Sequence, residues 1–321
     1  MLGEACALAA AMTWAVSLIL FKRSEAVSPL AMNLFKNAVA STLLLLTLPF
    51  SEGTLLAPRS PEAWARIVIS GVFGIAICDV LVFMALRRLG ASLLAVVDCC
   101  YAPVIVLFSL LVLGEEPGGW TFGLGALLVI GGVVLATTEQ LPRSEVEPPS
   151  GEGRAAGVAM GVTGIVFMGL GVVLVKPVLE TSGLVEVTLL RLLAGLAVQL
   201  LWCAALPSQR EALAVFRTRT VWKTLVPASV LGSYVAMLLW LGGFKWASAS
   251  VASVLNQLSA VFVMVLAWVF LGERLSLRRA LGGAAAVAGA ALILGSPKVD
   301  APRALPVTGA AAVESATPIA R

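Results

Sequence analysis

The 321-residue chain contains no histidine. Histidine is the commonest metal ligand and the usual proton shuttle near neutral pH, so its absence weighs against a membrane-embedded or metal-dependent enzyme. The sequence also lacks a Gly-rich P-loop, which argues against direct use of ATP. We therefore expect a protein that is not an enzyme and that uses no metal and no cofactor.

Cysteine is scarce and forms no recognisable framework. The five cysteines are Cys6, Cys78, Cys99, Cys100 and Cys203. Their number is odd, their spacing fits no metal site, and all of them fall inside apolar runs. Free cysteine in such surroundings behaves as a small hydrophobic residue, so we expect no disulfide framework.

Charge is the third thing the chain has little of. Only 12% of the residues are charged and 60% are hydrophobic, with a mean hydropathy of +0.99, which is far from a soluble protein. A membrane-spanning helix needs about 20 mostly apolar residues. Ten runs meet this need, at 2–21, 29–50, 66–86, 91–113, 119–137, 155–175, 183–206, 221–243, 249–271 and 277–295. The composition predicts an all-α integral membrane protein with ten transmembrane helices.

One short motif occurs twice. Leu113-Gly114-Glu115 returns as Leu271-Gly272-Glu273, 158 residues later, and each copy ends one apolar run before another begins. The same offset aligns Gly74 with Gly232, Ala91-Ser92 with Ala249-Ser250, Val96 with Val254, Gly125-Ala126 with Gly283-Ala284, and Gly131 with Gly289. A single ungapped offset over this length indicates duplication.

The duplication predicts how the chain is organised. Five runs per copy is an odd number, so the second copy must enter the membrane from the opposite face, as an inverted repeat. We expect a first five-helix unit at 1–137, a linker at 138–154, a second unit at 155–295 and a disordered tail at 296–321. Charged and Pro-containing residues at 51–65 predict a loop, and residues 207–220 predict a loop with a short surface helix.

These features resemble the drug/metabolite transporter (DMT) superfamily, and within it the EamA-type permeases. The resemblance rests on the two five-helix repeats, the Gly-Glu step closing each fourth helix, the Gly-rich fifth helices, and a basic residue early in each second helix (Lys36 and Arg191). It covers residues 2 to about 295. It implies a secondary carrier that exports a small organic metabolite or amino acid by alternating access, without a nucleic-acid partner, as a monomer or homodimer in a bacterial inner membrane. The alternative is a lipid flippase or membrane scaffold without a defined solute.

Three ionisable residues lie deep inside the runs. Each such group costs about 2.5–3.5 kcal/mol to insert, so it is a functional hypothesis by default. Lys36 lies about 12 Å along its helix at 1.5 Å per residue. Asp79 and Asp98 lie at similar distances from the 87–90 turn, so all three are expected at one depth near the middle of the membrane.

Two interpretations of these charges stay open. Lys36 and one aspartate can form a purely structural ion pair, or at least one acid can serve substrate binding or proton coupling. The repeat offset places Asn256 opposite Asp98 and Met237 opposite Asp79, so the second unit keeps a cation but loses both acids. This asymmetry favours a coupling task. Our hypothesis makes Asp98 the protonatable group and Asp79 the partner of Lys36.

The remaining site candidates are polar or aromatic. Arg191 is either an anchor for a substrate carboxylate or phosphate, because arginine offers a fork of donors, or a tie to backbone carbonyls. Asn256 and Gln257 either contact substrate or link helices. The aromatic candidates for lining a cavity are Trp14, Tyr101, Tyr234 and Trp240, with Tyr101 one turn beyond Asp98.

Two further features are expected to be structural. Glu115 and Glu273 follow helix C-termini, where a carboxylate is unfavourable, so we expect each to be held by the N-terminus of the next helix or by an arginine such as Arg274. Gly123, Gly125, Gly131, Gly132, Gly282, Gly283 and Gly289 predict a close helix–helix seam or a dimer face.

The orientation in the membrane is left open by the sequence. Lys22, Arg23, Arg87 and Arg88 fall on the side richer in positive charge, and Arg59, Lys176 and Lys245 fall on the other. Positive-inside counting places the richer side in the cytoplasm and both termini outside. The resemblance implies both termini inside.

Overall fold

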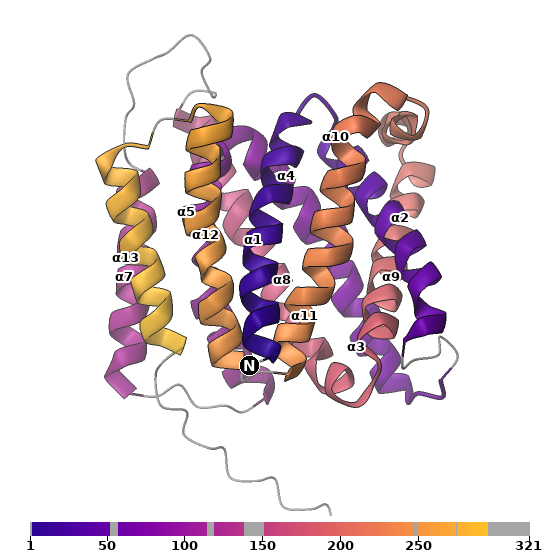
Figure 1. The fold of residues 1–321 in the computed structure, drawn as a ribbon, viewed down its shortest axis with the longest axis horizontal. Helices are drawn as coiled ribbons and strands as arrows, with labels where there is room; N and C mark the ends of the chain where they lie inside the picture. The colour runs from indigo at the N-terminus through magenta and orange to yellow at the C-terminus, as the bar shows by residue number, and fades with distance from the viewer. Residues whose placement is uncertain are drawn as a thin grey trace, which may run out of the picture.

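The structure is a computed structural model that describes residues 2–51, 57–113, 119–137, 151–246, 249–273 and 275–294. In these ranges all regular secondary structure is helical. Long helices run side by side in one bundle, with the N-terminus at one end (Figure 1).

The helices of the first part of the chain follow the predicted runs, with breaks. They are α1 (Leu2–Arg23), α2 (Pro29–Thr47), the 3₁₀ turn η1 (Leu48–Phe50), α3 (Pro61–Gly71), the π-helix η2 (Val72–Ile77), α4 (Cys78–Leu89), α5 (Ala91–Asp98), α6 (Tyr101–Phe108), the π-helix η3 (Ser109–Leu113) and α7 (Gly119–Thr137).

The second part contains a similar series. It comprises α8 (Gly151–Thr181), α9 (Leu184–Ala205), the 3₁₀ helix η4 (Pro207–Phe216), α10 (Arg219–Ser229), the π-helix η5 (Val230–Val235), α11 (Ala236–Trp246), α12 (Ala249–Leu271) and α13 (Leu277–Leu294). The short helix expected within 207–220 is η4, in which Ala212 and Val215 are buried.

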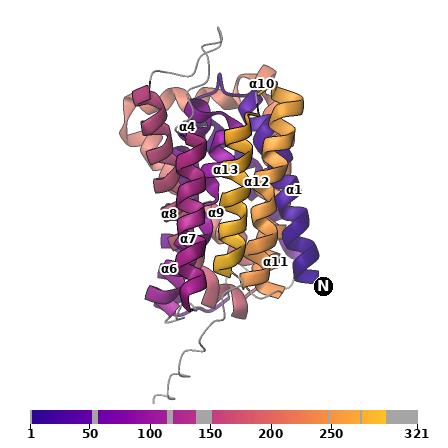
Figure 2. The same cartoon turned by 90° about the vertical axis from the view of Figure 1, so that its left-hand side faces the viewer.

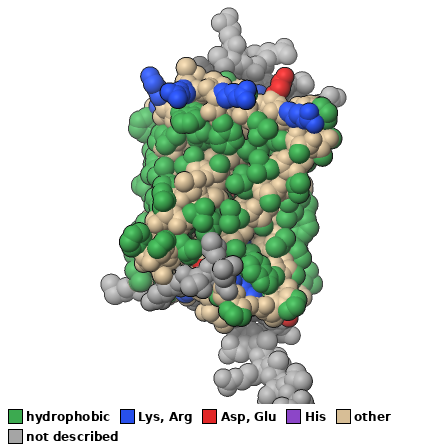
Figure 3. All heavy atoms as spheres, turned by 90° about the vertical axis from the view of Figure 1, so that its right-hand side faces the viewer, with side chains coloured by type: hydrophobic (Ala, Val, Ile, Leu, Met, Phe, Trp, Pro, Cys, Tyr) green, Lys and Arg blue, Asp and Glu red, His purple; other side chains and the backbone are tan. Residues whose placement is uncertain are grey.

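Several helical stretches are long and apolar enough to cross a membrane. Within the described residues, seven qualify by length and hydropathy: Leu2–Arg23, Pro29–Phe50, Pro61–Leu89, Ala91–Val112, Gly153–Thr181, Leu184–Ala205 and Arg219–Trp246. Apolar side chains cover the middle of the visible face, and Lys and Arg gather at the end away from the N-terminus (Figure 3). This distribution is that of an integral, multi-pass membrane protein.

Helix starts follow Ser-Pro steps. The Ser28 hydroxyl accepts from the Ala31 N–H at 3.3 Å, and the Ser60 hydroxyl accepts from the Ala63 N–H at 3.2 Å. In both cases proline occupies the first helical position, where its missing N–H costs nothing. The predicted C-terminal boundary of the 51–65 loop is therefore wrong, because α3 begins at Pro61.

The predicted continuous helix 91–113 is interrupted beside Asp98. The Cys99 and Cys100 N–H groups bond to the Val96 and Val97 carbonyls at 3.1 and 3.0 Å, a 3₁₀ pattern, before α6 begins at Tyr101. Pro103 explains the break. It has no N–H for the carbonyl four residues earlier, and its ring clashes there.

The ends of the two units differ in part from expectation. Residues 138–150 of the predicted linker 138–154 lie outside the described residues, whereas 151–154 already belong to α8. The predicted tail 296–321 also lies outside the described part of the chain.

The π-helices η2 and η5 occupy equivalent places in the sequence. They cover 72–77 and 230–235, so they are separated by 158 residues, the offset of the Leu-Gly-Glu motif. A Cβ added at Gly74 in η2 would lie 3.8 Å from the Gly171 Cα of α8. A Cβ added at Gly232 in η5 would meet the Ser17 side chain of α1. Helix α8 thus crosses η2 as α1 crosses η5.

The glycines of α7 and α13 face each other. A Cβ added at Gly282 would lie 2.6 Å from the Gly132 carbonyl oxygen, and one added at Gly289 would lie 2.5 Å from that of Gly125. Only glycine allows this approach, so these four residues form a seam within the chain, where α7 and α13 lie side by side (Figure 2). Gly123 and Gly131 have open space beside them.

Candidate substrate and coupling site

Lys36 and Asp79 form a buried ion pair. Lys36 is the eighth residue of α2, and its Nζ lies 2.6 Å from Asp79 Oδ2 at the start of α4. Only 2% of the Lys36 side chain and 15% of the Asp79 side chain are exposed. The partnership predicted from depth alone is therefore present, and it ties α2 to α4.

The sequence reasoning missed the amides around this pair. Asn37 Oδ1 accepts from Lys36 Nζ at 3.2 Å, and Asn37 Nδ2 donates to Asn33 Oδ1 at 3.0 Å and to Gln199 Oε1 at 3.3 Å. Asn33 in turn donates to the Ile75 carbonyl of η2 at 2.9 Å. The signal was available, since Asn33 and Asn37 are four residues apart beside Lys36 within an apolar run. Through Gln199 of α9 the network reaches the second part of the chain.

Arg191 is the eighth residue of α9, as Lys36 is of α2. Only 2% of it is exposed, and its Nε and Nη1 have no hydrogen-bond partner among the described residues. At these two atoms the alternative of a tie to backbone carbonyls is not found. Its side chain passes Gly74, where an added Cβ would lie 3.3 Å from Nη2. Because Gly74 belongs to η2, the guanidinium is directed toward the first part of the chain.

Glu186, the acid nearest to Arg191 in the sequence, is engaged elsewhere. It forms an ion pair with Arg59, which precedes α3, and both side chains are almost fully buried. The sequence predicts only a loop at 51–65 around Arg59 and gives no indication of this pair. The contact joins two segments more than 120 residues apart, so no local pattern could reveal it.

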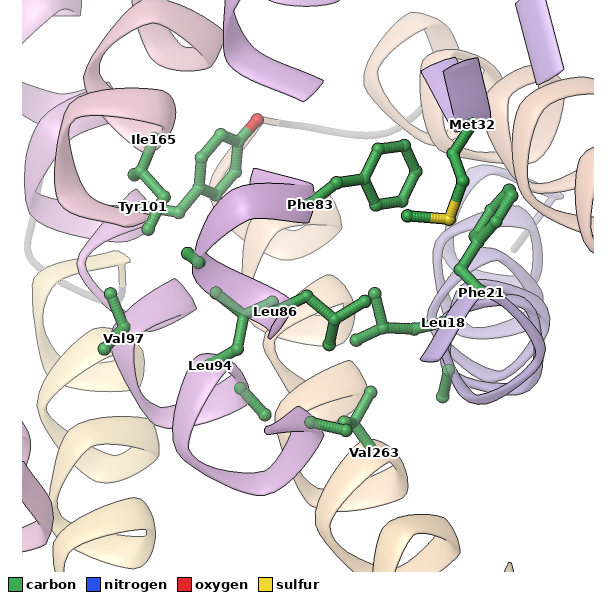
Figure 4. Packing of buried hydrophobic residues seen from close by; sticks show 14 of the residues in the cluster. Leu18, Phe21, Met32, Phe83, Leu86, Leu94, Val97, Tyr101, Ile165 and Val263 are labelled. Atoms are coloured by element: carbon green, nitrogen blue, oxygen red, sulfur yellow. The ribbon is translucent and has the colours of Figure 1, made fainter. Parts of the chain in front are cut away.

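Asp98 borders a small cavity in the apolar core. The cavity measures about 20 Å³ and is lined by Trp14, Leu18, Val82, Leu94, Ala95, Asp98, Ile165, Ser259, Ala260 and Val263. Figure 4 shows four of these lining residues, Leu18, Leu94, Ile165 and Val263, within the apolar core. This volume suits about one water molecule. Among the described residues no side chain bonds the Asp98 carboxylate.

The other predicted residues are divided between core and cavity. Trp14 lines the cavity as expected, whereas Tyr101 lies in the core beside Ile165 (Figure 4). Tyr234 lies in η5 and packs on a second apolar cluster that includes Leu189 and Leu192, and Trp240 packs on the main core and on Phe244.

The two amide residues of α12 are Asn256 and Gln257, for which the sequence left two roles open, contacting substrate or linking helices. Gln257 is buried and Asn256 is partly buried. In the described part of the chain, Asn256 Nδ2 and Gln257 Oε1 have no hydrogen-bond partner. These two atoms therefore do not link helices in this conformation, and a role in contacting substrate remains a prediction.

Glu273 acts as a clamp, with an unexpected partner. Its carboxylate accepts from the N–H groups of Ala91 at 2.8 Å and Ser92 at 2.9 Å, at the N-terminus of α5. A carboxylate is stabilising there, because the helix dipole and the free N–H groups favour negative charge. The predicted holder was the next helix or Arg274. The carboxylate reaches instead across to the first part of the chain, while Glu115 and Arg274 lie outside the described residues.

Removing this clamp should have a measurable cost. We expect Glu273→Ala to lower the free energy of unfolding by about 1–3 kcal/mol, since both a helix cap and a favourable dipole interaction are lost. Thermal unfolding of the detergent-purified protein measures the effect. Glu62→Ala is the matched control, because its exposed pair with Arg66 contributes little. Equal unfolding temperatures for the two variants would contradict the clamp.

Comparison with known proteins places this architecture in a family. The model of the EamA-like transporter family matches residues 1–138 and 155–295. Protein PecM of Dickeya dadantii (strain 3937) is 26% identical over 223 residues, which span 67% of this chain and 69% of PecM. A protein of known crystal structure superposes with a TM-score of 0.64 at 18% identity, over 90% of this chain and 95% of that one, a likeness that shows the fold alone. Because the family model covers most of its length, this chain belongs to the EamA-like transporter family.

Proposed function

We propose that the protein is a secondary-active efflux permease of a bacterial inner membrane that moves a small organic metabolite by alternating access. The observation that carries this proposal is the polar cluster buried where the two parts of the chain meet. Lys36, Asp79 and Asn37 belong to the first part, and Gln199 and Arg191 to the second. A scaffold needs no such groups in the membrane, where each is costly.

We further propose that the cluster lies between two inverted five-helix units, within residues 1–137 and 151–295, joined by a linker at 138–150. The equal spacing of η2 and η5 supports this arrangement, as does the way α8 packs on η2 and α1 on η5. The Ser17 hydroxyl donates to the Ala228 carbonyl at 2.8 Å, and an added Cβ at Gly171 would lie 3.1 Å from the Ser70 carbonyl. Residues 70 and 228 are again 158 apart.

Coupling to protons is assigned in this proposal to Asp98. Asp79 is already paired with Lys36, so we assign it the structural role of holding this ion pair. Asp98 has no such partner among the described residues and borders a cavity whose lining comes from both parts of the chain, with Trp14 on α1 and Ser259 on α12. A carboxyl group in this position can bind a proton from one side and release it to the other as the cavity changes its exposure.

Reconstitution tests the proposed function. Purified protein in liposomes should exchange a labelled solute from a panel of amino acids and organic acids against an internal excess of the same solute. Empty liposomes are the blank, and movement of a fluorescent phospholipid between leaflets is followed in parallel. Lipid movement without exchange of any solute would indicate a flippase and refute the carrier.

A further inference from the structure

The polar cluster contains two basic residues, Lys36 and Arg191, but one acidic residue, Asp79, so its positive charges exceed its negative charges by one. Lys36 pairs with Asp79 at 2.6 Å, whereas Arg191 forms no ion pair with any described residue. The other two acids nearby form no ion pair with Arg191. Glu186 pairs with Arg59, and Asp98 borders the cavity lined by Trp14 and Ser259. Arg191 therefore carries a buried charge with two nitrogens that no described residue bonds.

Helices α2 and α9 each carry a buried basic residue, but the sequence places a matching carboxylate only for the residue on α2. Lys36 and Arg191 are each the eighth residue of their helix. The counter-ion of Lys36 is Asp79, and the residue 158 positions later is Met237. The position that corresponds to Asp79 in the second part of the chain therefore holds a thioether and not a carboxylate. A buried guanidinium without its own carboxylate is costly unless another anion approaches it.

We propose that the solute of this carrier is an organic monoanion, a monocarboxylate, and that Arg191 is its anchor. This inference rests on the proposed function and names the substrate class of the same site. Guanidinium groups match carboxylates in geometry. A single negative charge neutralises the excess of the cluster, whereas a phosphate dianion would reverse it. Gly74 contributes by leaving space, because a Cβ there would press on Nη2 at 3.3 Å.

Binding to the purified protein in detergent tests this inference without any transport step. Acetate, lactate, benzoate and phenylacetate are compared with their uncharged amides by the shift in unfolding temperature, at up to about 10 mM, above the usual KM range. At least one acid should stabilise the wild type while its amide does not. Arg191→Gln should weaken that binding at least about tenfold, as expected for loss of a charged hydrogen bond.

Matched variants keep the result interpretable. Arg66→Gln, which changes a partly exposed arginine, should bind the acid as the wild type does. Should Arg191→Gln not fold, Gly74→Ala serves instead, since it crowds the guanidinium and keeps its charge, and it too should weaken binding. Equal shifts for acid and amide, full binding by the Arg191 and Gly74 variants, or no shift with any acid would overturn the proposal.

Three further outcomes separate the possible failures. If chloride or phosphate alone gives the whole stabilisation, Arg191 holds an inorganic ion and the monocarboxylate assignment falls. If liposomes exchange neutral solutes while no acid binds, the carrier stands and only the substrate class is wrong. If an acid binds through Arg191 and no solute is exchanged, the anchor stands and the transport function fails.

Discussion

Asp79→Leu should lower the free energy of unfolding by about 3–5 kcal/mol, because it strands the buried ammonium group of Lys36 without its counter-ion. Lys36→Met should cost a similar amount by stranding Asp79. The double variant Lys36→Met/Asp79→Leu should recover most of the loss, since an apolar pair of similar volume replaces the charges. Thermal unfolding in detergent and the fraction of monodisperse protein measure all three.

The two single variants and the double variant together show whether the ion pair itself or other contacts of Lys36 stabilise the fold. If the ion pair only holds α2 against α4, the double variant folds nearly as well as the wild type. A double variant that is as unstable as either single one would show that Lys36 has other obligatory partners. Asn37, which accepts from Lys36 at 3.2 Å and donates to Gln199, would then be the first to examine.

Asp98→Asn should abolish transport driven by a pH gradient and leave counterflow at equal pH largely intact. Asparagine is close in size to aspartate but cannot carry a proton through the cycle, and exchange requires no net proton movement. Both assays use the same proteoliposomes, so folded protein content is matched. Ser259→Ala, in the same cavity but without a titratable group, should retain both activities.

The coupling hypothesis fails if Asp98→Asn keeps full gradient-driven transport. Asp98 would then be a structural residue or at most a substrate contact. Loss of both activities in Asp98→Asn, with Ser259→Ala intact, would also contradict the hypothesis, because it would make Asp98 necessary for exchange itself.

The Lys36–Asp79 pair could be predicted because it depends on simple geometry. Membrane thickness fixes where each run begins, and the rise per residue fixes depth, so two ionisable residues at equal depth become candidate partners. The spans themselves are visible for a related reason. Every backbone group in a bilayer must be satisfied internally, which makes long apolar runs helices.

Partners that come from distant segments could not be predicted in this way. The sequence predicts that Glu273 bonds within its own unit, but its carboxylate accepts from the N–H groups of Ala91 and Ser92, 181 or more residues away in sequence. The Arg59–Glu186 pair was missed for the same reason. The break after Asp98 is different. Pro103 lies four residues beyond Cys99 and gave a local signal that the continuous run of apolar residues concealed.

Accessibility of the Asp98 cavity from the two sides of the membrane tests the central claim most directly. Ser259→Cys, in a protein whose five native cysteines are replaced by alanine, is exposed to a membrane-impermeant maleimide in right-side-out and inside-out vesicles. Alternating access predicts labelling from both sides, each slowed by a transported solute. Labelling from one side only, or from neither, would contradict the account.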